Sequence, residues 1–195
     1  MKKKALPIEL IVFDFNGVIV ADTQACKEAD DEVIMHFGGT PPSLRQYRET
    51  VIIPAIQFYS LYGCNKHRLE ASPDQMGQIF HGFYGPRTKN LRTRKGVRQV
   101  LSYLQANSIP AIILSNHTQK GVEAQLERLG LTRFFGAVLA NQEDYTSMVE
   151  RNKLRRLQSF LKEEAITLIS ALEPQPMVWV RIFLSFLARV IYFAF

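Results

Sequence analysis

An apolar run near the start of the chain ends abruptly on a carboxylate. Leu10 to Phe13 are followed by Asp14, and an amide and a glycine, Asn16 and Gly17, come two and three positions later. A short continuous apolar run before turn residues is typical of a buried strand, so we predict a strand over residues 8–14. In open α/β sheets, ligands bind beyond the carboxyl ends of the strands. We therefore expect the side chain of Asp14 to face a substrate.

The segment that follows has a different character, because residues 22–91 contain helical patterns and no convincing strand. We predict helices over residues 23–37, 43–62 and 73–84, the last with Pro73 in its first turn. These helices form an all-helical insertion between the first strand and the rest of a sheet.

From residue 95 onward, helical and strand patterns alternate. Apolar residues at helical spacing occur near residues 97–104, 122–129 and 154–161, and short apolar runs predict strands at 111–114, 137–140 and 166–169. Strands separated by helices need crossover connections, which predicts a doubly wound, Rossmann-like parallel sheet of the α/β class. We expect a core from residues 1–20 and 92–176, a helical cap from 21–91 and an atypical apolar tail from 177–195.

The sequence around Asp14 resembles the first motif of the haloacid dehalogenase superfamily, in particular that of its capped phosphatases. That motif reads Asp-x-Asp-Gly followed by Thr or Val, and Asp14, Gly17 and Val18 match it. Asn16 departs from it, because family phosphatases carry the general acid and base at this position. The resemblance covers residues 8 to about 169. It implies that Asp14 attacks a phosphorus atom and forms an aspartyl-phosphate.

Two further motifs of the family resemble parts of this chain. Ser115, after the strand at 111–114, matches the second motif, so its hydroxyl, Asn116 and nearby backbone amides are implied to bind phosphate. The alternative is that Ser115, Asn116 or Thr118 only caps the next helix. Lys153 resembles the third motif, whose lysine neutralises the phosphate and the nucleophile. Its neighbours Arg151, Arg155 and Arg156 are competing candidates, and such a cluster is often only a solvated face.

The resemblance also implies a magnesium ion, held by the Asp14 carboxylate and the backbone carbonyl of Asn16. A fourth motif, Gly-Asp with another Asp a few residues later, should follow the strand at 166–169. The sequence there reads Ser170-Ala-Leu-Glu-Pro174 instead. Because magnesium is a hard cation that needs oxygen ligands, we expect Mg²⁺ binding to be weak or lost.

The function implied is hydrolysis of a small phosphorylated metabolite, at a reduced rate. Asn16 cannot protonate a leaving group, and losing a general acid typically costs about 10² to 10⁴ in rate. His117 is a candidate substitute acid, but we favour the alternative that it is an ordinary loop histidine. Two alternatives stay open: a non-catalytic protein that binds phosphate esters, and a 2-haloacid dehalogenase, whose chemistry also uses an attacking Asp. Candidates for substrate contact near the insertion are Asp22, Arg45, Arg48, Lys89, Arg92 and Arg94.

Composition narrows the partners and the compartment. The excess of 24 basic over 18 acidic residues is scattered, which disfavours a nucleic-acid partner. Two cysteines, Cys26 and Cys64, form no disulfide or metal pattern, so a cytoplasmic location is expected.

The tail is unusual, because from residue 177 to 195 only Arg181, Ser185 and Arg189 are not apolar. Three explanations compete: a membrane-seeking helix, an element completing the core, and translation in another reading frame after about Glu164 or Ile169. A membrane anchor is disfavoured, because each arginine costs about 2.5 to 3.5 kcal/mol near the bilayer centre. The change of reading frame is favoured, because the resemblance to the family ends where the metal-binding motif is expected.

Overall fold

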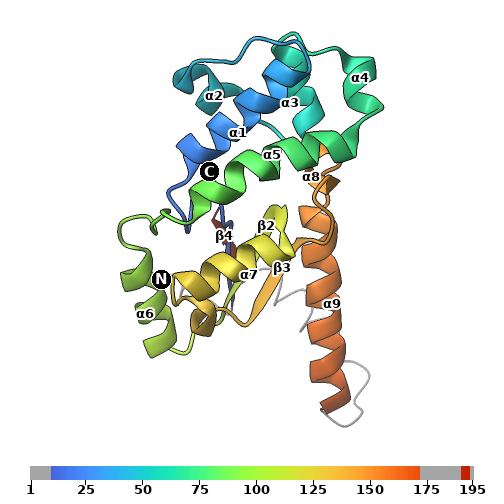
Figure 1. Cartoon of the computed structure of the whole chain (residues 1–195). Coiled ribbons are helices and arrows are strands. Elements are labelled where there is room, and N and C mark those ends of the chain that lie inside the picture. Colours follow the sequence, from blue (N-terminus) through green and yellow to red (C-terminus); the bar gives the residue numbers. More distant parts are fainter. Residues whose placement is uncertain (1–9, 172–189, 194–195) are drawn as a thin grey trace, which may run out of the picture.

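A computed structural model of the chain describes residues 10–171 and 190–193. Within these ranges the centre of the molecule is a parallel sheet with the strand order β3-β2-β1-β4 (Figure 1). Its strands are β1 (Leu10–Phe13), β2 (Ala111–Thr118), β3 (Ala137–Asn141) and β4 (Val190–Phe193). The predicted α/β class and the parallel sheet are confirmed.

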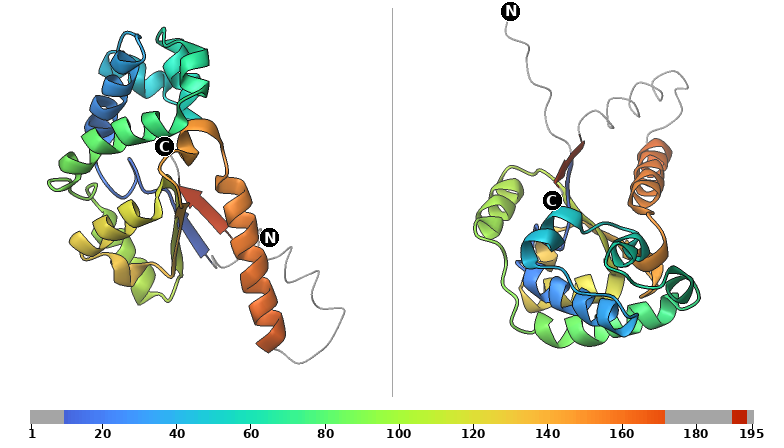
Figure 2. Two further views of the ribbon diagram at one scale, coloured as in Figure 1. Left: turned by 45° about the vertical axis from the view of Figure 1, so that its right-hand side comes forward. Right: turned by 90° about the horizontal axis from the view of Figure 1, so that it is seen from above.

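Helices cover both faces of this sheet. One face packs on α6 (Val97–Ala106) and α7 (Gln119–Arg128), where Ile11, Phe13 and Ile113 meet Leu101, Leu104, Val122 and Leu126. The alternate strand residues Leu10, Val12, Ile112 and Leu114 pack against Leu161 of α9 (Lys153–Ala171). Figure 2 shows α9 and α7 on opposite sides of the strands. Burial on both faces explains why the strands read as continuous apolar runs.

A group of helices lies between β1 and α6 in sequence and forms the upper part of the molecule in Figure 1. They are α1 (Thr23–His36), α2 (Leu44–Thr50), α3 (Ala55–Leu61), α4 (Lys66–Glu70) and α5 (Pro73–Thr88). They enclose a second apolar cluster that includes Val33, Ile34, Phe58 and Met76. Met148, from the short helix α8 (Thr146–Val149), joins the same cluster and so ties this helical insertion to the sheet.

The chain enters and leaves the insertion side by side. The N–H of Ala21 donates to the carbonyl of Arg92 at 3.0 Å, and the N–H of Arg94 donates to that of Ile19, also at 3.0 Å. Val20 and Thr93 form an isolated antiparallel bridge between these hydrogen bonds. The insertion is therefore attached to the rest of the molecule through two connecting segments that are hydrogen-bonded to each other, one following β1 and the other preceding α6.

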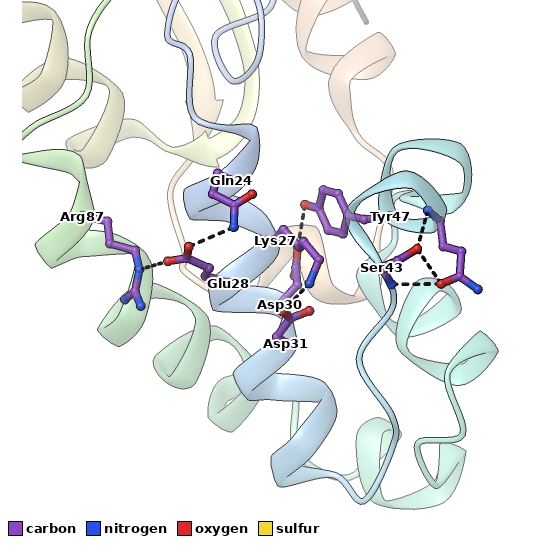
Figure 3. A network of polar contacts seen from close by, with 9 residues as sticks. Gln24, Lys27, Glu28, Asp30, Asp31, Ser43, Tyr47 and Arg87 are labelled. Atoms are coloured by element: carbon purple, nitrogen blue, oxygen red, sulfur yellow. Dashed lines mark hydrogen bonds and ion pairs between the residues drawn. The ribbon is translucent and has the colours of Figure 1, made fainter.

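The interior of the insertion contains a carboxyl group. Asp30 of α1 is buried and accepts a hydrogen bond from the hydroxyl of Tyr47 at 2.8 Å (Figure 3). The hydroxyl of Tyr59 also donates to it, at 2.8 Å. Burial raises the pKa of Asp30 to about 7, and the two tyrosine hydroxyls oppose the shift. On the opposite side of α1, Glu28 accepts from Arg87 of α5 at 2.6 Å. Polar contacts thus join α1 to α2, α3 and α5.

The predicted helix over 43–62 is wrong, because the structure divides it into α2 and α3. The break includes Pro54, whose nitrogen has no hydrogen to donate and which disfavours helical backbone in the residue before it. The short helix α4 was not expected. It begins where the side chain of Asn65 accepts from the N–H of Arg68 at 3.1 Å.

The predicted strand at 166–169 is also wrong, because α9 continues through it to Ala171. β-branched residues at 166, 167 and 169 suggested a strand, but no glycine or proline separates them from the preceding helical residues. Extending an existing helix is easier than starting a new element, so local preference was overridden. Leu154, expected on the buried side of this helix, is 69% exposed, whereas Leu161 is buried.

Part of the apolar tail lies in the sheet. β4 pairs with β1 in parallel, with Phe193 level with Phe13, in agreement with the explanation that the tail completes the core. Residues 172–189 and 194–195 lie outside the described residues, and so do most of the positions considered for a membrane helix. Among the described helices, none is long and apolar enough to cross a membrane. The change of reading frame stays a prediction about the coding DNA.

Candidate active site

Asp14 directly follows β1, at the carboxyl edge of the sheet. Its Oδ2 lies 2.7 Å from the Nζ of Lys153, and its Oδ1 accepts from the N–H of Phe15 at 2.8 Å. The two side chains of the ion pair are 15% and 20% exposed respectively, so the carboxylate is neither fully buried nor freely solvated. Lys153 is the first residue of α9, which packs on the face of the sheet opposite α6 and α7, and its side chain reaches the carboxyl edge from that face. The structure brings these two sequence-predicted residues together.

Ser115 lies in an irregular part of β2. The register between β2 and β3 shifts between Leu114 and Thr118, and an interrupted ladder of this kind redirects the side chains within it. The buried Ser115 Oγ accepts from the N–H of His117 at 3.0 Å and lies 3.5 Å from Asn16 Oδ1. The hydroxyl that caps α7 is that of Thr118, which accepts from the N–H of Gly121. Ser115 is therefore not the helix cap.

The backbone on either side of this irregularity is tied down. Asn116, the other residue expected to bind phosphate, accepts at its carbonyl from Asn141 Nδ2 at 2.7 Å. The carbonyl of Ser115 accepts from the guanidinium of Arg156 at 2.8 Å. Neither Asn141 nor Arg156 was singled out for this role by the sequence, because both act on backbone atoms and carry no motif of their own.

Asn16 has an unexpected set of partners. Its Nδ2 donates to Asp22 Oδ2 at 2.5 Å and to the hydroxyl of Tyr84 at 3.0 Å. Asp22 is 1% exposed and also accepts from the N–H of Gly17 at 2.8 Å. Of the residues near the insertion that were expected to contact substrate, Asp22 is thus taken up by the loop after β1. Arg94 also reaches this loop, donating from its Nε to the carbonyl of Gly17.

His117 is a poor candidate for the missing acid. Burial, followed by the charge of nearby His81, lowers the pKa of His117 to about 3, so the ring is neutral at ordinary pH. Its Nδ1 accepts from the N–H of Thr118 at 2.7 Å, as a neutral ring requires. His81 of α5 stacks on it with centroids 5.3 Å apart, and Tyr84 meets it edge-on at 5.1 Å. His117 serves here as a contact between the sheet and the insertion.

The expected magnesium ligands, Asp14 and Asn16, have protein partners among the described residues. Asp14 accepts from Lys153 and from the N–H of Phe15, and the nearby carboxylate of Asp22 accepts from Asn16 and from the N–H of Gly17. In the part of the chain that the structure describes, no group of three or more Asp, Glu, His or Cys side chains could hold a metal ion. The segment 166–169, after which the fourth motif was expected, is part of α9 and not a strand. The expected ligands Asp14 and Asn16 thus have no carboxylate partner for the ion among these residues.

Comparison with known proteins agrees with this architecture. The family model of haloacid dehalogenase-like hydrolases matches residues 11–167. No curated protein matches the chain. A predicted phosphatase from Clostridium acetobutylicum is similar in fold, at 13% identity and a TM-score of 0.67 over 81% of this chain and 71% of the other. A haloacid dehalogenase-like family hydrolase from Streptococcus pneumoniae is similar at 16% identity and a TM-score of 0.64, over 80% and 70%.

The match to the family model spans most of the chain, so the chain belongs to the haloacid dehalogenase-like hydrolases. A third structure, of a phosphoglycolate phosphatase candidate from Lactobacillus plantarum, shares the fold at 15% identity and a TM-score of 0.66, over 87% of this chain and 75% of the other. At such identities the likeness defines the fold, and the chemistry has to be argued from the residues of this chain.

Proposed function

We propose that this protein is a slow hydrolase of small phosphate monoesters that works through an aspartyl-phosphate on Asp14. The observation that carries the proposal is the 2.7 Å contact between Asp14 Oδ2 and Lys153 Nζ at the carboxyl edge of the sheet. The ammonium group offsets charge on the carboxylate and on an incoming phosphate, whose transfer depends mainly on positioning and electrostatics. Ser115, Asn116 and their backbone amides are proposed to hold the phosphate oxygens.

The reaction has two displacements. In the first, a carboxylate oxygen of Asp14 forms a bond to phosphorus, and the bond from phosphorus to the ester oxygen breaks, releasing an alkoxide or phenolate. In the second, water attacks the phosphorus, releases inorganic phosphate and restores Asp14. Asn16 has no proton to give in the first step and accepts none in the second. We therefore propose that leaving groups that need no protonation react fastest, and that the second step is slow.

An experiment on the purified protein tests this order of steps. Excess p-nitrophenyl phosphate is added rapidly, with and without Mg²⁺, and nitrophenolate is followed with time. We expect a burst of about one nitrophenolate per protein molecule and then a slow steady rate. An alkyl phosphate should react about 10² to 10⁴ times more slowly in the burst phase.

The controls separate the enzyme from a protein that only binds phosphate esters. Asp14→Asn should abolish the burst, whereas Glu49→Gln, on the exposed face of α2, should preserve it. A burst that survives in Asp14→Asn overturns the proposed nucleophile. Binding of inorganic phosphate without any burst, at any magnesium concentration, supports the non-catalytic alternative.

A second candidate is favoured by the same geometry. Halide ions leave without protonation, so the amide at position 16 costs a 2-haloacid dehalogenase nothing in its first step. Asp14 would form an ester with the carbon and expel halide, and Lys153 would neutralise the substrate carboxylate. Release of chloride from 2-chloropropionate without added metal, abolished by Asp14→Asn, would favour this reaction over phosphate transfer.

The remaining expectations belong to the same proposal. We take residues 21–91 as a cap that selects the substrate and residues 1–20 and 92–176 as the core, a division supported by the separate apolar cluster inside the insertion. The substrate is proposed to be a phosphorylated metabolite in the cytoplasm. Two cysteines that form no disulfide, Cys26 and Cys64, are in keeping with that compartment.

A further inference from the structure

The carboxylate of Asp22 is buried beside the proposed nucleophile loop without a cationic partner among its contacts. It stands at the N-cap position of α1 but makes no capping bond to that helix. It accepts instead from four neutral groups, at 2.5 Å from Asn16 Nδ2, 2.8 Å from Gly17 N, 2.8 Å from the Tyr84 hydroxyl and 3.5 Å from the thiol of Cys26. A buried carboxylate is costly unless it is hydrogen-bonded, so these donors define its place.

The contact determines which way the amide of Asn16 faces. A carboxylate only accepts hydrogen bonds, so the group of Asn16 that touches Asp22 must be the NH₂ and not the oxygen. The second hydrogen of this NH₂ goes to the Tyr84 hydroxyl at 3.0 Å. The amide oxygen is left on the side of Ser115, whose Oγ lies 3.5 Å away. Residue 16 therefore presents an acceptor, not a donor, toward the groups proposed to bind phosphate.

We infer that Asp22 is the positioning residue of this site: its buried carboxylate holds the Asn16 amide with its oxygen toward the phosphate-binding side. The position of the amide oxygen there matters only if the site binds a phosphoryl group, so this inference rests on the proposed function. It also explains why an amide stands at position 16. An aspartate there would bring a second carboxylate to about the 2.5 Å that now separates Asn16 Nδ2 from Asp22 Oδ2.

The pairing predicts that the two residues can be exchanged but not changed alone. Asn16→Asp removes both donors of the NH₂ and sets two carboxylates against each other. In Asn16→Asp/Asp22→Asn, the new amide at position 22 can donate to the new carboxylate at position 16. The exchanged pair therefore regains a complementary contact and also carries an acid at the position where the family phosphatases have one.

The experiment combines unfolding with turnover in four proteins: the parent, each single variant and the exchanged pair. We expect Asn16→Asp to lower the midpoint of thermal unfolding by about 5 °C or more and the exchanged pair to recover most of that loss. Asp22→Asn keeps the shape of the side chain. It should lower kcat for p-nitrophenyl phosphate about fivefold to tenfold with little change in KM, as expected when the amide oxygen of Asn16 is no longer aligned to accept from the water that attacks phosphorus in the second step. Asp31→Asn, on the same helix and outside this network, is the matched control and should keep the parent kcat.

The exchanged pair gives the sharpest result. It should hydrolyse alkyl phosphates faster than the parent, by at least about tenfold, because position 16 then carries a general acid. If the carboxylate of Asp22 has a purely structural role, the exchanged pair should recover its unfolding midpoint and Asp22→Asn should keep the parent kcat. That outcome, or unfolding effects of the two changes that simply add, overturns the inference.

A further measurement separates this inference from the proposed function. If the parent shows no turnover, affinity for orthovanadate replaces kcat as the measured quantity, because a vanadate hydroxyl can donate to the amide oxygen of Asn16. A fivefold to tenfold weaker affinity in Asp22→Asn then supports the positioning role although the proposed hydrolysis has failed. An unchanged affinity refutes the positioning role.

Discussion

Replacing Asp30 by Asn should make the stability of the protein rise with pH relative to that of the parent. Asp30 is buried in the helical insertion, where its pKa is raised to about 7 from an ordinary value of 3.8. The folded protein therefore holds a proton that the unfolded chain has already lost between about pH 4 and pH 7. Stability from this group is present below pH 4 and is lost as the pH rises through 7.

The size of the effect follows from the two pKa values. Proton binding by Asp30 favours the folded over the unfolded state by a factor that falls about a hundredfold between about pH 5 and pH 8. Each factor of ten is worth about 1.4 kcal/mol. Asp30 should thus lower the free energy of unfolding by about 2.5 kcal/mol over this range. An asparagine does not titrate. Its amide can still bond both hydroxyls, since one tyrosine donates to Oδ1 and the other accepts from Nδ2.

His117 acts in the opposite direction and has to be separated. Its pKa falls to about 3 from an ordinary 6.5, so the unfolded chain binds the extra proton and stability rises with pH from about 3 to 6.5. Over about pH 5 to 8 this amounts to about 2 kcal/mol. The two contributions nearly cancel in the parent protein, whereas in Asp30→Asn the histidine contribution stands alone.

Urea unfolding at about pH 5, 6.5 and 8 measures the difference. The parent should show little net dependence on pH from these two groups, and Asp30→Asn should become more stable relative to the parent by about 2.5 kcal/mol as the pH rises. Groups shared by both proteins drop out of the comparison. A difference between the two proteins that stays constant within about 0.5 kcal/mol would refute the shifted pKa of Asp30.

Two further predictions concern packing and the proposed site. Gly39→Ala should lower the free energy of unfolding by about 1 to 3 kcal/mol in urea, because its Cβ would lie 2.5 Å from a backbone carbonyl. Gly82→Ala in α5 meets nothing within 4 Å and should raise it by about 0.5 to 1 kcal/mol, so equal effects would contradict this account. Lys153→Met should weaken inorganic phosphate binding at least about tenfold by calorimetry, as loss of the charged partner of Asp14 implies. Lys162→Met, on the exposed face of α9, is its control, and equal affinities in the two variants would exclude Lys153 from the phosphate site.

The strands β1, β2 and β3 were predictable because each reads as a short apolar run, and the runs in β1 and at the start of β2 are buried on both faces. The helices α1, α6 and α7 also followed from spacing, with Gly130, at a positive φ of 64°, ending the turn after α7. The errors arose where one residue or an existing element outweighed periodicity. Pro54 divides the 43–62 segment, and α9 extends through 166–169. An element completing the core was only one of three explanations offered for the tail, and the pairing of β4 with β1 was not predictable because it joins residues about 180 positions apart.

The proposed site could be predicted only in part. Asp14, Ser115 and Lys153 lie in segments that resemble the family motifs. Asp14 directly follows β1 and Lys153 begins α9, so their meeting follows from topology, whereas Ser115 lies within the irregular part of β2. The partners of Asn16 do not follow in this way. Tyr84 is 68 residues away and looks like any aromatic residue of a helix, and the contact forms because α5 packs across α1. Asp22 stands at the N-cap position of α1, where the sequence suggests a helix cap. Only the structure shows that its side chain is buried and bonds Asn16 instead.

The hydrogen bond between Ala21 and Arg92 has an evolutionary consequence. Because the chain departs and returns within 3.0 Å, everything between these residues can be lengthened, shortened or exchanged without altering strand order. A lineage can thus acquire a different insertion at this one point while the sheet beneath it keeps its strand order. Asp22 and Tyr84 are exceptions, since they belong to the insertion by sequence but bond Asn16 of the proposed site, and an insertion that lacked them would have to restore partners for Asn16.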